Sequence, residues 1–303
     1  MTATFVVSIE VELGWGTHDL NDFSHLSADG SVEREFLDLF LQIADRHSVA
    51  VTFNVVGKLF DKCDTNNDRH LYPSGWFSSE TGQKGLFYGP DLINAIDNTD
   101  VNHEVCTHTY SHILFEDMSR NVAQADLREA QRTHYERYRS KTKSLVPPRH
   151  QEPEMETLKE NNIEIIRLGR PLQSSTRPGL FWELFVGLPF AHTPRTVDDV
   201  VETYVSRFPS LTVPLLPRGR SSPPSVFKLI PTEFRGRTYR YGIKRALDQA
   251  SKNNQVVHLW CHVYNFSSKQ QIKHIDKLFS MVSSRDDVQT KTMAQLNEAV
   301  RGQ

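Results

Sequence analysis

The chain has 303 residues, a formal net charge of −2 and a sequence pI near 6.7. This length is enough for one large α/β domain or two small ones, and the balanced charge excludes bulk attraction to nucleic acid or to anionic lipid. No stretch approaches the roughly 18 apolar residues of a membrane span, so we expect none. Met1 leads directly into a strand, and the three cysteines lack disulfide or metal spacing, which favours a cytoplasmic protein with reduced thiols.

Alternating strands and helices are predicted along the first half of the chain. Strands are expected at residues 4–9, 49–56 and 102–106, where β-branched and aromatic residues gather. Apolar residues at helical spacing predict a helix between Val32 and Ile43, and Pro90 is placed to open a short one. The polar stretch 61–89 is too long for an ordinary connection, so we interpret it as a lid or rim.

The second half continues this alternation around a less regular stretch. Helices are predicted at residues 121–139, with Ser119 as N-cap, and at 155–161, 239–252, 267–281 and 293–300; strands are predicted at 144–146, 163–166, 256–262 and 288–292. This rhythm favours parallel βαβ units with functional residues at the carboxyl ends of strands. The pattern loosens over residues 171–224, where we expect one helix at 196–207 and where Pro214, Pro217, Pro223 and Pro224 break up the rest. A strand is expected at 227–230. We interpret 171–224 as an insertion packed on the barrel, so that residues 1–303 form a single domain.

Two acidic residues, Glu10 and Glu12, end the first strand. Residues two apart in a strand point to the same face, so both carboxylates are expected to project into one space. The alternative is an edge strand with its polar face in water. The continuous apolar run before them instead indicates a strand covered on both faces, where a carboxylate is costly unless it is paired or bound to metal.

Two histidines, His108 and His112, follow the strand at 102–106, where a loop or the start of a helix is expected. A spacing of four places them on one face of a helical turn, from which both imidazoles could reach a single cation. The alternative is a pair of surface histidines on a polar turn. Together with one carboxylate for the metal and another as general base, they make up the minimal set of a divalent-metal hydrolase.

Five segments carry a family resemblance in the same order along the chain. They are SIEVELGWG at 8–16, VTFNVVG at 51–57, HEVCTHTYSH at 103–112, PPRHQ at 147–151 and VHLWCH at 257–262. They resemble the motifs of the polysaccharide deacetylase (NodB-like, carbohydrate esterase family 4) superfamily. The resemblance implies an α/β fold, a distorted (β/α) barrel of about seven parallel strands, here with an irregular insertion.

The resemblance also implies roles for individual residues. Glu12, His108 and His112 would bind a divalent cation, Zn²⁺ in the first place and Co²⁺ or Ni²⁺ as alternatives. Glu10 falls at the catalytic base, where the family has aspartate; the extra methylene would displace the carboxylate by about 1 Å, enough to cost around a hundredfold in rate. Arg149 would hold the carboxylate of this base, with an ordinary surface arginine after a strand as the alternative. His262 would be the general acid.

Further residues are expected around this centre. Trp15, Trp260 and Tyr264 could form a wall on which a sugar stacks, although buried aromatic residues more often belong to a core. We expect His258, on the same strand face as His262 and deeper, to be structural. His103 and Glu104 are candidates for orienting the metal ligands, with a plain role at a strand end as the alternative.

The resulting functional hypothesis is a metal-dependent hydrolase that removes an N-acyl group, in the first place acetyl, from an amino sugar or glycan. Two alternatives stay open. The same scaffold could deformylate a sugar or open a cyclic amide, and the substitution at Glu10 leaves room for a metal- or carbohydrate-binding protein that has lost catalysis. The sequence does not indicate an oligomeric state.

Overall fold

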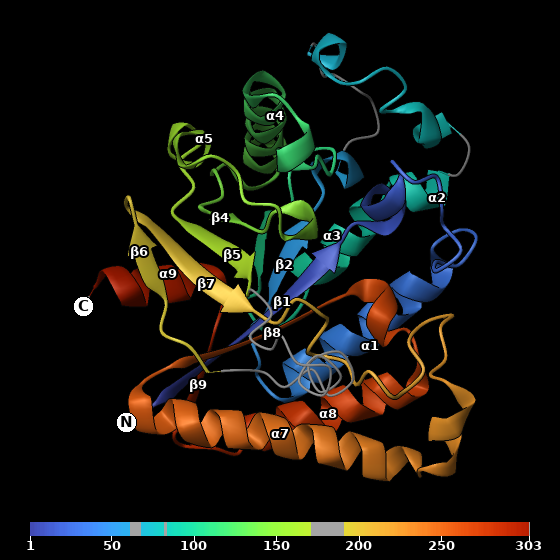
Figure 1. The fold of residues 1–303 in the computed structure, drawn as a ribbon, viewed down its shortest axis with the longest axis vertical. Helices are drawn as coiled ribbons and strands as arrows, with labels where there is room; N and C mark the ends of the chain where they lie inside the picture. The colour runs from blue at the N-terminus through green and yellow to red at the C-terminus, as the bar shows by residue number, and fades with distance from the viewer. Residues whose placement is uncertain (61–67, 82–83, 171–190, 303) are drawn as a thin grey trace.

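The computed structural model describes residues 1–60, 68–81, 84–170 and 191–302. Its centre is a curled, mostly parallel sheet surrounded by helices (Figure 1). In these residues the sheet has nine strands: β1 Ala3–Val11, β2 Thr52–Val55, β3 Glu104–Thr107, β4 Ser144–Leu145, β5 Ile165–Gly169, β6 Arg195–Val197, β7 Val200–Val205, β8 Val256–His262 and β9 Val288–Lys291. The order is β6-β7-β5-β4-β3-β2-β1-β8, with β9 on β1, and only β6 pairs antiparallel. The predicted distorted α/β barrel is confirmed, with more strands than expected.

Strand β1 carries the sequence signal that organises the sheet. It pairs in parallel with β2, β8 and β9. Phe5, Val7 and Ile9 belong to the core beneath the helices, whereas Val6 packs in a separate cluster with residues from β3, β5 and β7. Because side chains alternate along a strand, Ser8 and Glu10 share the side of Val6, which is the inside of the barrel.

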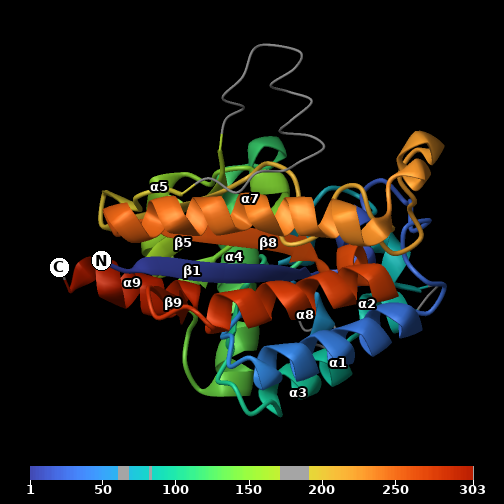
Figure 2. The ribbon, with the colours of Figure 1, turned by 90° about the horizontal axis from the view of Figure 1, so that it is seen from below.

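Helices cover the outside of the sheet. Figure 2 shows α7 Thr232–Asn253 on one side of β1 and β8, and α8 Lys269–Ser283, α1 Ser31–Arg46 and α3 Pro90–Asp97 on the other. The remaining helices are α2 Lys84–Phe87, α4 Arg120–Tyr138, α5 Met155–Glu160 and α9 Met293–Arg301. Two predicted helix starts are confirmed: Ser119 caps α4 by accepting the N–H of Val122, and Pro90 lies in the first turn of α3.

Two predicted elements are wrong. Residues 196–207 do not form a helix: they contribute to the hairpin of β6 and β7, which turns at Asp198 and Asp199 with φ of 47° and 69°. Both residues adopt the left-handed region that a two-residue hairpin turn requires, and the β-branched valines on either side suit strands. Residues 227–230 are not a strand, because a 3₁₀ helix, η7 Ser225–Leu229, occupies them between two prolines.

The predicted insertion and the predicted rim are only partly described. Residues 171–190 of the predicted insertion lie outside the described residues. Within its described part, β7 pairs with β5 and so belongs to the main sheet. The following residues run beside β8, where the N–H groups of Ser210 and Leu211 donate to the carbonyl of Trp260. Of the stretch 61–89, residues 68–81 and 84–89 are described and include Trp76, which contacts the histidine motif. Among all described residues, no helix is both long enough and apolar enough to cross a membrane.

Candidate active site

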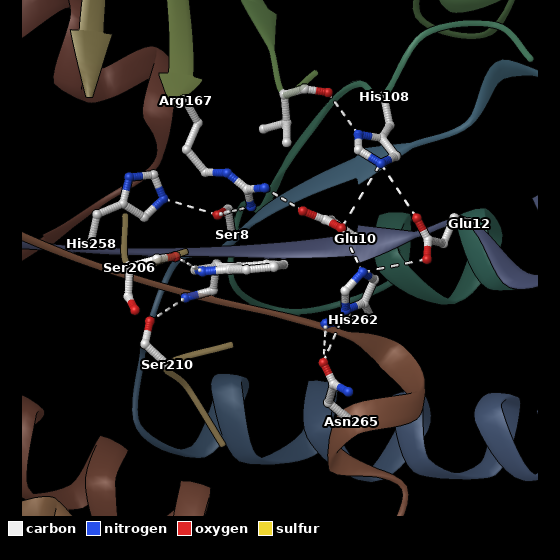
Figure 3. Close-up of polar contacts among 12 residues, drawn as sticks. Ser8, Glu10, Glu12, His108, Arg167, Ser206, Ser210, His258, His262 and Asn265 are labelled. Atoms are coloured by element: carbon white, nitrogen blue, oxygen red, sulfur yellow. Dashed lines mark hydrogen bonds and ion pairs between the residues drawn. The ribbon is translucent and has the colours of Figure 1, made fainter. Parts of the chain in front are cut away.

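The two carboxylates of the first motif lie at the carboxyl end of β1 and are both buried. Figure 3 shows Glu10 and Glu12 pointing toward His108 and His262. His262 ends β8, which pairs with β1, and His108 follows β3, which lies beyond β2 on the other side of β1. A side chain at Gly16 would overlap the carboxylate of Glu12, so this glycine leaves room for it. The predicted convergence of Glu10 and Glu12 is therefore present.

The histidine motif is not helical, contrary to the prediction. Strand β3 ends at Thr107, and the next residues form a bent loop in which Thr109 and His112 have φ of 65° and 58°. Two left-handed residues reverse the chain within four positions, so that His112 returns beside His108, with ring centroids 5.1 Å apart. The imidazoles are brought together by this reversal and not by helical periodicity.

Asp126 on α4 holds this loop in place. Its carboxylate accepts the N–H groups of Tyr110 at 2.6 Å and Ser111 at 3.1 Å, and the Ser111 hydroxyl at 2.6 Å. Tyr72 donates to the same carboxylate at 3.2 Å, and the Trp76 indole N–H donates to Ser111 Oγ at 3.0 Å. Burial raises the pKa of Asp126 to about 6 against the opposing effect of these hydrogen bonds. The prediction missed this residue, whose only sequence signal is an acidic side chain between apolar residues of a helix.

Glu12, His108 and His112 present three donor atoms to one point. Glu12 Oε2 lies 3.4 Å from His108 Nε2 and 3.2 Å from His112 Nε2. Ligands about 2.0–2.1 Å from a tetrahedral cation lie about 3.4 Å from each other. His108 donates its Nδ1 proton to the carbonyl of Val146 at 2.6 Å, so its Nε2 carries a lone pair, and this buried atom has no hydrogen-bond partner among the described residues. These residues fit a divalent cation.

A second group, Glu10, Glu12 and His262, also lies close enough to share a cation. In it, however, both ring nitrogens of His262 face oxygen acceptors: Nδ1 lies 3.0 Å from Asn265 Oδ1, and Nε2 lies 2.8 Å from Glu10 Oε2. An imidazole that donates from both nitrogens is protonated and has no lone pair for a metal. The first group is therefore the better cation site.

The guanidinium that holds Glu10 belongs to Arg167, not to Arg149 as predicted. Arg167 lies on β5, is fully buried and donates from Nη2 to Glu10 Oε1 and from Nη1 to Ser8 Oγ at 3.0 Å. Arg149 instead forms an ion pair of 2.7 Å with Asp19, where its side chain is 35% exposed. The signal that could have identified Arg167 is a charged residue inside the apolar run Ile165–Gly169, which is costly unless it is paired.

Charges around the site set its protonation. Burial raises the pKa of Glu10, but His262 and then Arg167 outweigh burial and hold the pKa well below its usual range. Burial lowers the pKa of His262, but Glu10 and Glu12 raise it to about 9. Glu12 is likewise lowered in pKa, because His262, His108 and His112 outweigh burial. In the cation-free protein, the pair is a carboxylate and an imidazolium at neutral pH.

A buried chain of hydrogen bonds continues behind Arg167 (Figure 3). Ser8 Oγ accepts from Arg167, so its one proton goes to His258 Nε2 at 2.9 Å. His258 Nδ1 then donates to Thr203 Oγ1 at 3.1 Å, and Thr203 lies 3.0 Å from His192 Nε2. His258 is thus a neutral, buried residue that lies behind the site, and burial followed by the charge of Arg167 lowers its pKa.

Of the predicted aromatic wall, only Tyr264 lies at the site surface. Trp15 is 1% exposed and packs against Phe87, to whose carbonyl its indole donates at 3.2 Å. Trp260 is 4% exposed, and its ring lies 4.7 Å from the guanidinium carbon of Arg167, so it supports the arginine. Tyr264 is half-buried and stacks on the His262 ring at 4.6 Å.

The structure separates His103 and Glu104 from the metal ligands. His103 accepts the N–H of Val51 at 3.2 Å, and Glu104 accepts from Thr52 Oγ1 and from the N–H of Ala294. Both lie at the amino end of β3, whereas the ligands follow its carboxyl end. Of the two roles that the sequence left open, orienting the ligands is wrong and the plain role at a strand end is confirmed: Glu104 connects β2 to the start of α9.

His18, which was not predicted to be part of the site, lies beside His112 of the histidine motif. It is 4% exposed, its Nδ1 lies 2.7 Å from the carbonyl of Trp15, and its ring centroid is 6.4 Å from that of His112 and 4.6 Å from that of Trp76. Burial lowers its pKa to about 4. A neutral imidazole therefore joins the first motif to the described part of the 61–89 stretch.

A comparison with known protein families matches part of the sequence. The sequence matches the family described as polysaccharide deacetylase over residues 25–162. This span contains His108, His112 and the PPRHQ segment, and it excludes both glutamates of the first motif and His262. No curated protein matches the sequence.

Several solved structures share the fold at low sequence identity. A protein of Mycobacterium smegmatis assigned as a polysaccharide deacetylase is 16% identical with a TM-score of 0.63, covering 99% of this chain and 91% of that one. One of Pseudomonas aeruginosa PAO1, assigned in the same way, is 11% identical with a TM-score of 0.64 and the same coverage, 99% and 91%. Puue allantoinase is 10% identical with a TM-score of 0.58, covering 99% and 90%. The family match and the shared barrel fold confirm the predicted resemblance of this chain to the polysaccharide deacetylase (NodB-like) superfamily.

Proposed function

We propose that this protein is a metal-dependent hydrolase that removes an N-acyl group, in the first place acetyl, from an amino sugar or glycan. The observation that carries the proposal is the juxtaposition of two buried groups. Three donor atoms of Glu12, His108 and His112 surround one point, and the ion pair of Glu10 with His262 lies directly beside them, with His108 Nε2 at 3.9 Å from Glu10 Oε2.

A divalent cation held by Glu12, His108 and His112 would polarise the amide carbonyl and acidify a water molecule. Glu10 accepts the proton of the water that attacks the carbonyl carbon, because it is an ionised carboxylate held by Arg167. His262 donates a proton to the departing nitrogen as the C–N bond breaks. One water is consumed, and the products are a carboxylic acid and a free amine.

The glutamate at position 10 is compatible with catalysis in this arrangement. Its longer side chain ends between Arg167 on one oxygen and His262 on the other, at 2.8 Å, so the carboxylate is fixed and does not point into the apolar core. Asn265 orients the far side of His262 by accepting its Nδ1 proton at 3.0 Å. These contacts support an active enzyme over a binding protein that has lost catalysis.

Substrate recognition is proposed on fewer observations. Tyr264, half-buried and stacked on His262, is the aromatic residue best placed to contact a sugar ring. Trp15 and Trp260 are too buried for this role. Zn²⁺ as the cation, with Co²⁺ or Ni²⁺ as alternatives, and a cytoplasmic location stay predictions from the sequence.

The proposal is tested by metal analysis and turnover on a panel of N-acetyl sugars, N-formyl sugars and cyclic ureides. We expect one divalent metal per chain and release of acetate from an amino sugar. The ureides belong in the panel because an allantoinase shares the fold; turnover of ureides alone would overturn the sugar assignment.

Variants of Glu10 separate an enzyme from a binding protein. Glu10→Gln preserves the shape but removes the proton acceptor, so turnover should fall by roughly 10²–10⁴-fold with unchanged metal content. Glu10→Asp should also impair the enzyme, since the shorter carboxylate no longer reaches both Arg167 and His262. Metal binding without turnover of any acylated sugar, in the wild type and in Glu10→Asp alike, would favour the binding protein.

A further inference from the structure

An exposed surface on η7 and the start of α7 combines apolar and basic side chains. Leu229 is 85% exposed, Phe234 and Tyr241 are each 62% exposed, and Ile230 is 36% exposed. Phe234 and Tyr241 are seven positions apart and therefore share one face of α7. On the same face lie Arg237, Lys244 and Arg245, all exposed. We call these seven residues the basic apolar face.

The charge of this region differs from that of the whole chain. Residues 218–245 contain eight lysines and arginines and one acidic residue, although the formal net charge of the chain is −2. That acidic residue, Glu233, is already paired with Lys277 at 2.6 Å and Arg240 at 3.2 Å. Among the described residues, Arg237 and Arg245 have no carboxylate partner. Lys244 pairs with Asp248 at 2.8 Å, so the charges of Arg237 and Arg245 are the ones that the face offers to an external anion.

A groove beside the basic apolar face adds further cations. It lies between α7 and α8, has a volume of about 360 Å³ and is lined by Arg240, Lys269 and Lys273 on its charged side. Glu233 is the only acidic residue that lines it. Anionic groups could thus be neutralised both on the exposed face of α7 and in the adjoining groove.

This region adjoins the mouth of the active site. The turn at residues 218–221 approaches η8 Val263–Phe266 so closely that a Cβ at Gly219 would lie 2.7 Å from the Tyr264 carbonyl. Ser268 Oγ donates to the carbonyl of Pro217 at 2.8 Å. Tyr264 in turn stacks on His262. Figures 1 and 2 show the start of α7 at the end of the barrel toward which β1 and β8 point.

We propose that the basic apolar face docks the protein on the anionic surface of a lipid bilayer. Aliphatic and aromatic side chains would enter the boundary between headgroups and acyl chains, while the arginines and lysines pair with lipid phosphates. The exposed aliphatic residues favour a bilayer over a nucleic acid or an acidic protein chain, because Leu229 and Ile230 gain nothing from a polyanion in water. Docking would bring the mouth of the site to the bilayer, and this proposal does not depend on the reaction catalysed.

Co-sedimentation of the full chain with vesicles tests the proposal. We expect binding to vesicles of equimolar phosphatidylglycerol and phosphatidylcholine, weakening as salt rises, and little binding to phosphatidylcholine alone. The double variant Arg237→Gln, Arg245→Gln should bind about 25-fold more weakly, at about a fivefold loss per removed charge. Leu229→Ser with Phe234→Ser should weaken binding by roughly tenfold or more.

Matched controls lie on the far side of the molecule. Arg139→Gln with Lys141→Gln also removes two exposed charges, and Tyr135→Ser removes a 50% exposed aromatic ring from α4. These variants should bind as the wild type does. All substituted side chains are exposed, and a melting temperature within a few degrees of the wild type verifies folding.

Three results would overturn the proposal. One is no binding to anionic vesicles by the folded wild type. Another is equal loss in the control variants, which would mean that binding follows net charge. The third is binding that depends on Arg237 and Arg245 but not on Leu229 and Phe234, together with competition by a soluble polyanion, which would assign the surface to a polyanionic partner.

Discussion

Replacement of Arg167 by methionine tests the central feature of the site. Arg167 is fully buried and its partner Glu10 has a side chain only 6% exposed. Removing one partner of a buried ion pair leaves an uncompensated charge and costs about 3–5 kcal/mol. In a protein of this size that corresponds to a fall of roughly 5–8 °C in melting temperature.

The same substitution should change the pH dependence of turnover. Burial raises the pKa of Glu10, and His262 and Arg167 together hold it far below its usual range. Without Arg167 the pKa of Glu10 rises, so the base becomes protonated at a higher pH and the acidic limb of kcat/KM against pH moves upward. Arg167→Lys keeps the charge but loses the second hydrogen bond to Ser8, and should move the limb less.

Arg149 provides the matched control. It was predicted to hold Glu10, but it pairs with Asp19 at a partly exposed position, where such pairs contribute about 0–1 kcal/mol. Thermal unfolding and the pH profile of Arg149→Met should therefore stay close to those of the wild type. If Arg149→Met moved the acidic limb and Arg167→Met did not, the assignment of Arg167 would be refuted.

Three further changes test other parts of the site. Asp126→Asn replaces one of the oxygens that accept N–H groups of the loop carrying His108 and His112, so metal affinity measured against a chelator should fall roughly 10–100-fold. Unchanged affinity would show that the loop keeps its conformation without Asp126. His258→Phe leaves Ser8 and Thr203 without their buried partner and should lower the free energy of unfolding, measured in urea, by about 1–3 kcal/mol. An unchanged free energy would show that this chain of hydrogen bonds does not stabilise the fold. Burial lowers the pKa of His262, but its carboxylate neighbours raise it to about 9, above roughly 6.5 in the unfolded chain. Its stabilising contribution is therefore complete below about 6.5 and lost as pH rises through 9, so the melting temperature of the metal-free protein should fall over this window and fall less in His262→Gln.

Much of the site was predictable because its residues lie within short sequence motifs. Alternation along β1 places Glu10 and Glu12 on the barrel side of the strand whatever surrounds them. The resemblance of five ordered motifs to a known family led to His108, His112 and His262, and parallel strands do bring these carboxyl ends to one edge of the sheet. Helix starts at Ser119 and Pro90 were also predictable, since capping is decided within one turn.

Only the tertiary structure decided which distant segments are in contact and which turns bring them together. Arg167 reaches Glu10 across 157 positions; its place inside an apolar strand indicates that it is buried and paired, but no local pattern identifies Glu10 as its partner. The loop conformation with left-handed Thr109 and His112 depends on Asp126 of α4. Its carboxylate accepts two N–H groups of the loop, which would point elsewhere in a helical turn. Buried charges and reversed loops are stable only when partners from elsewhere in the chain satisfy them, and the closure of the sheet determines which partners those are.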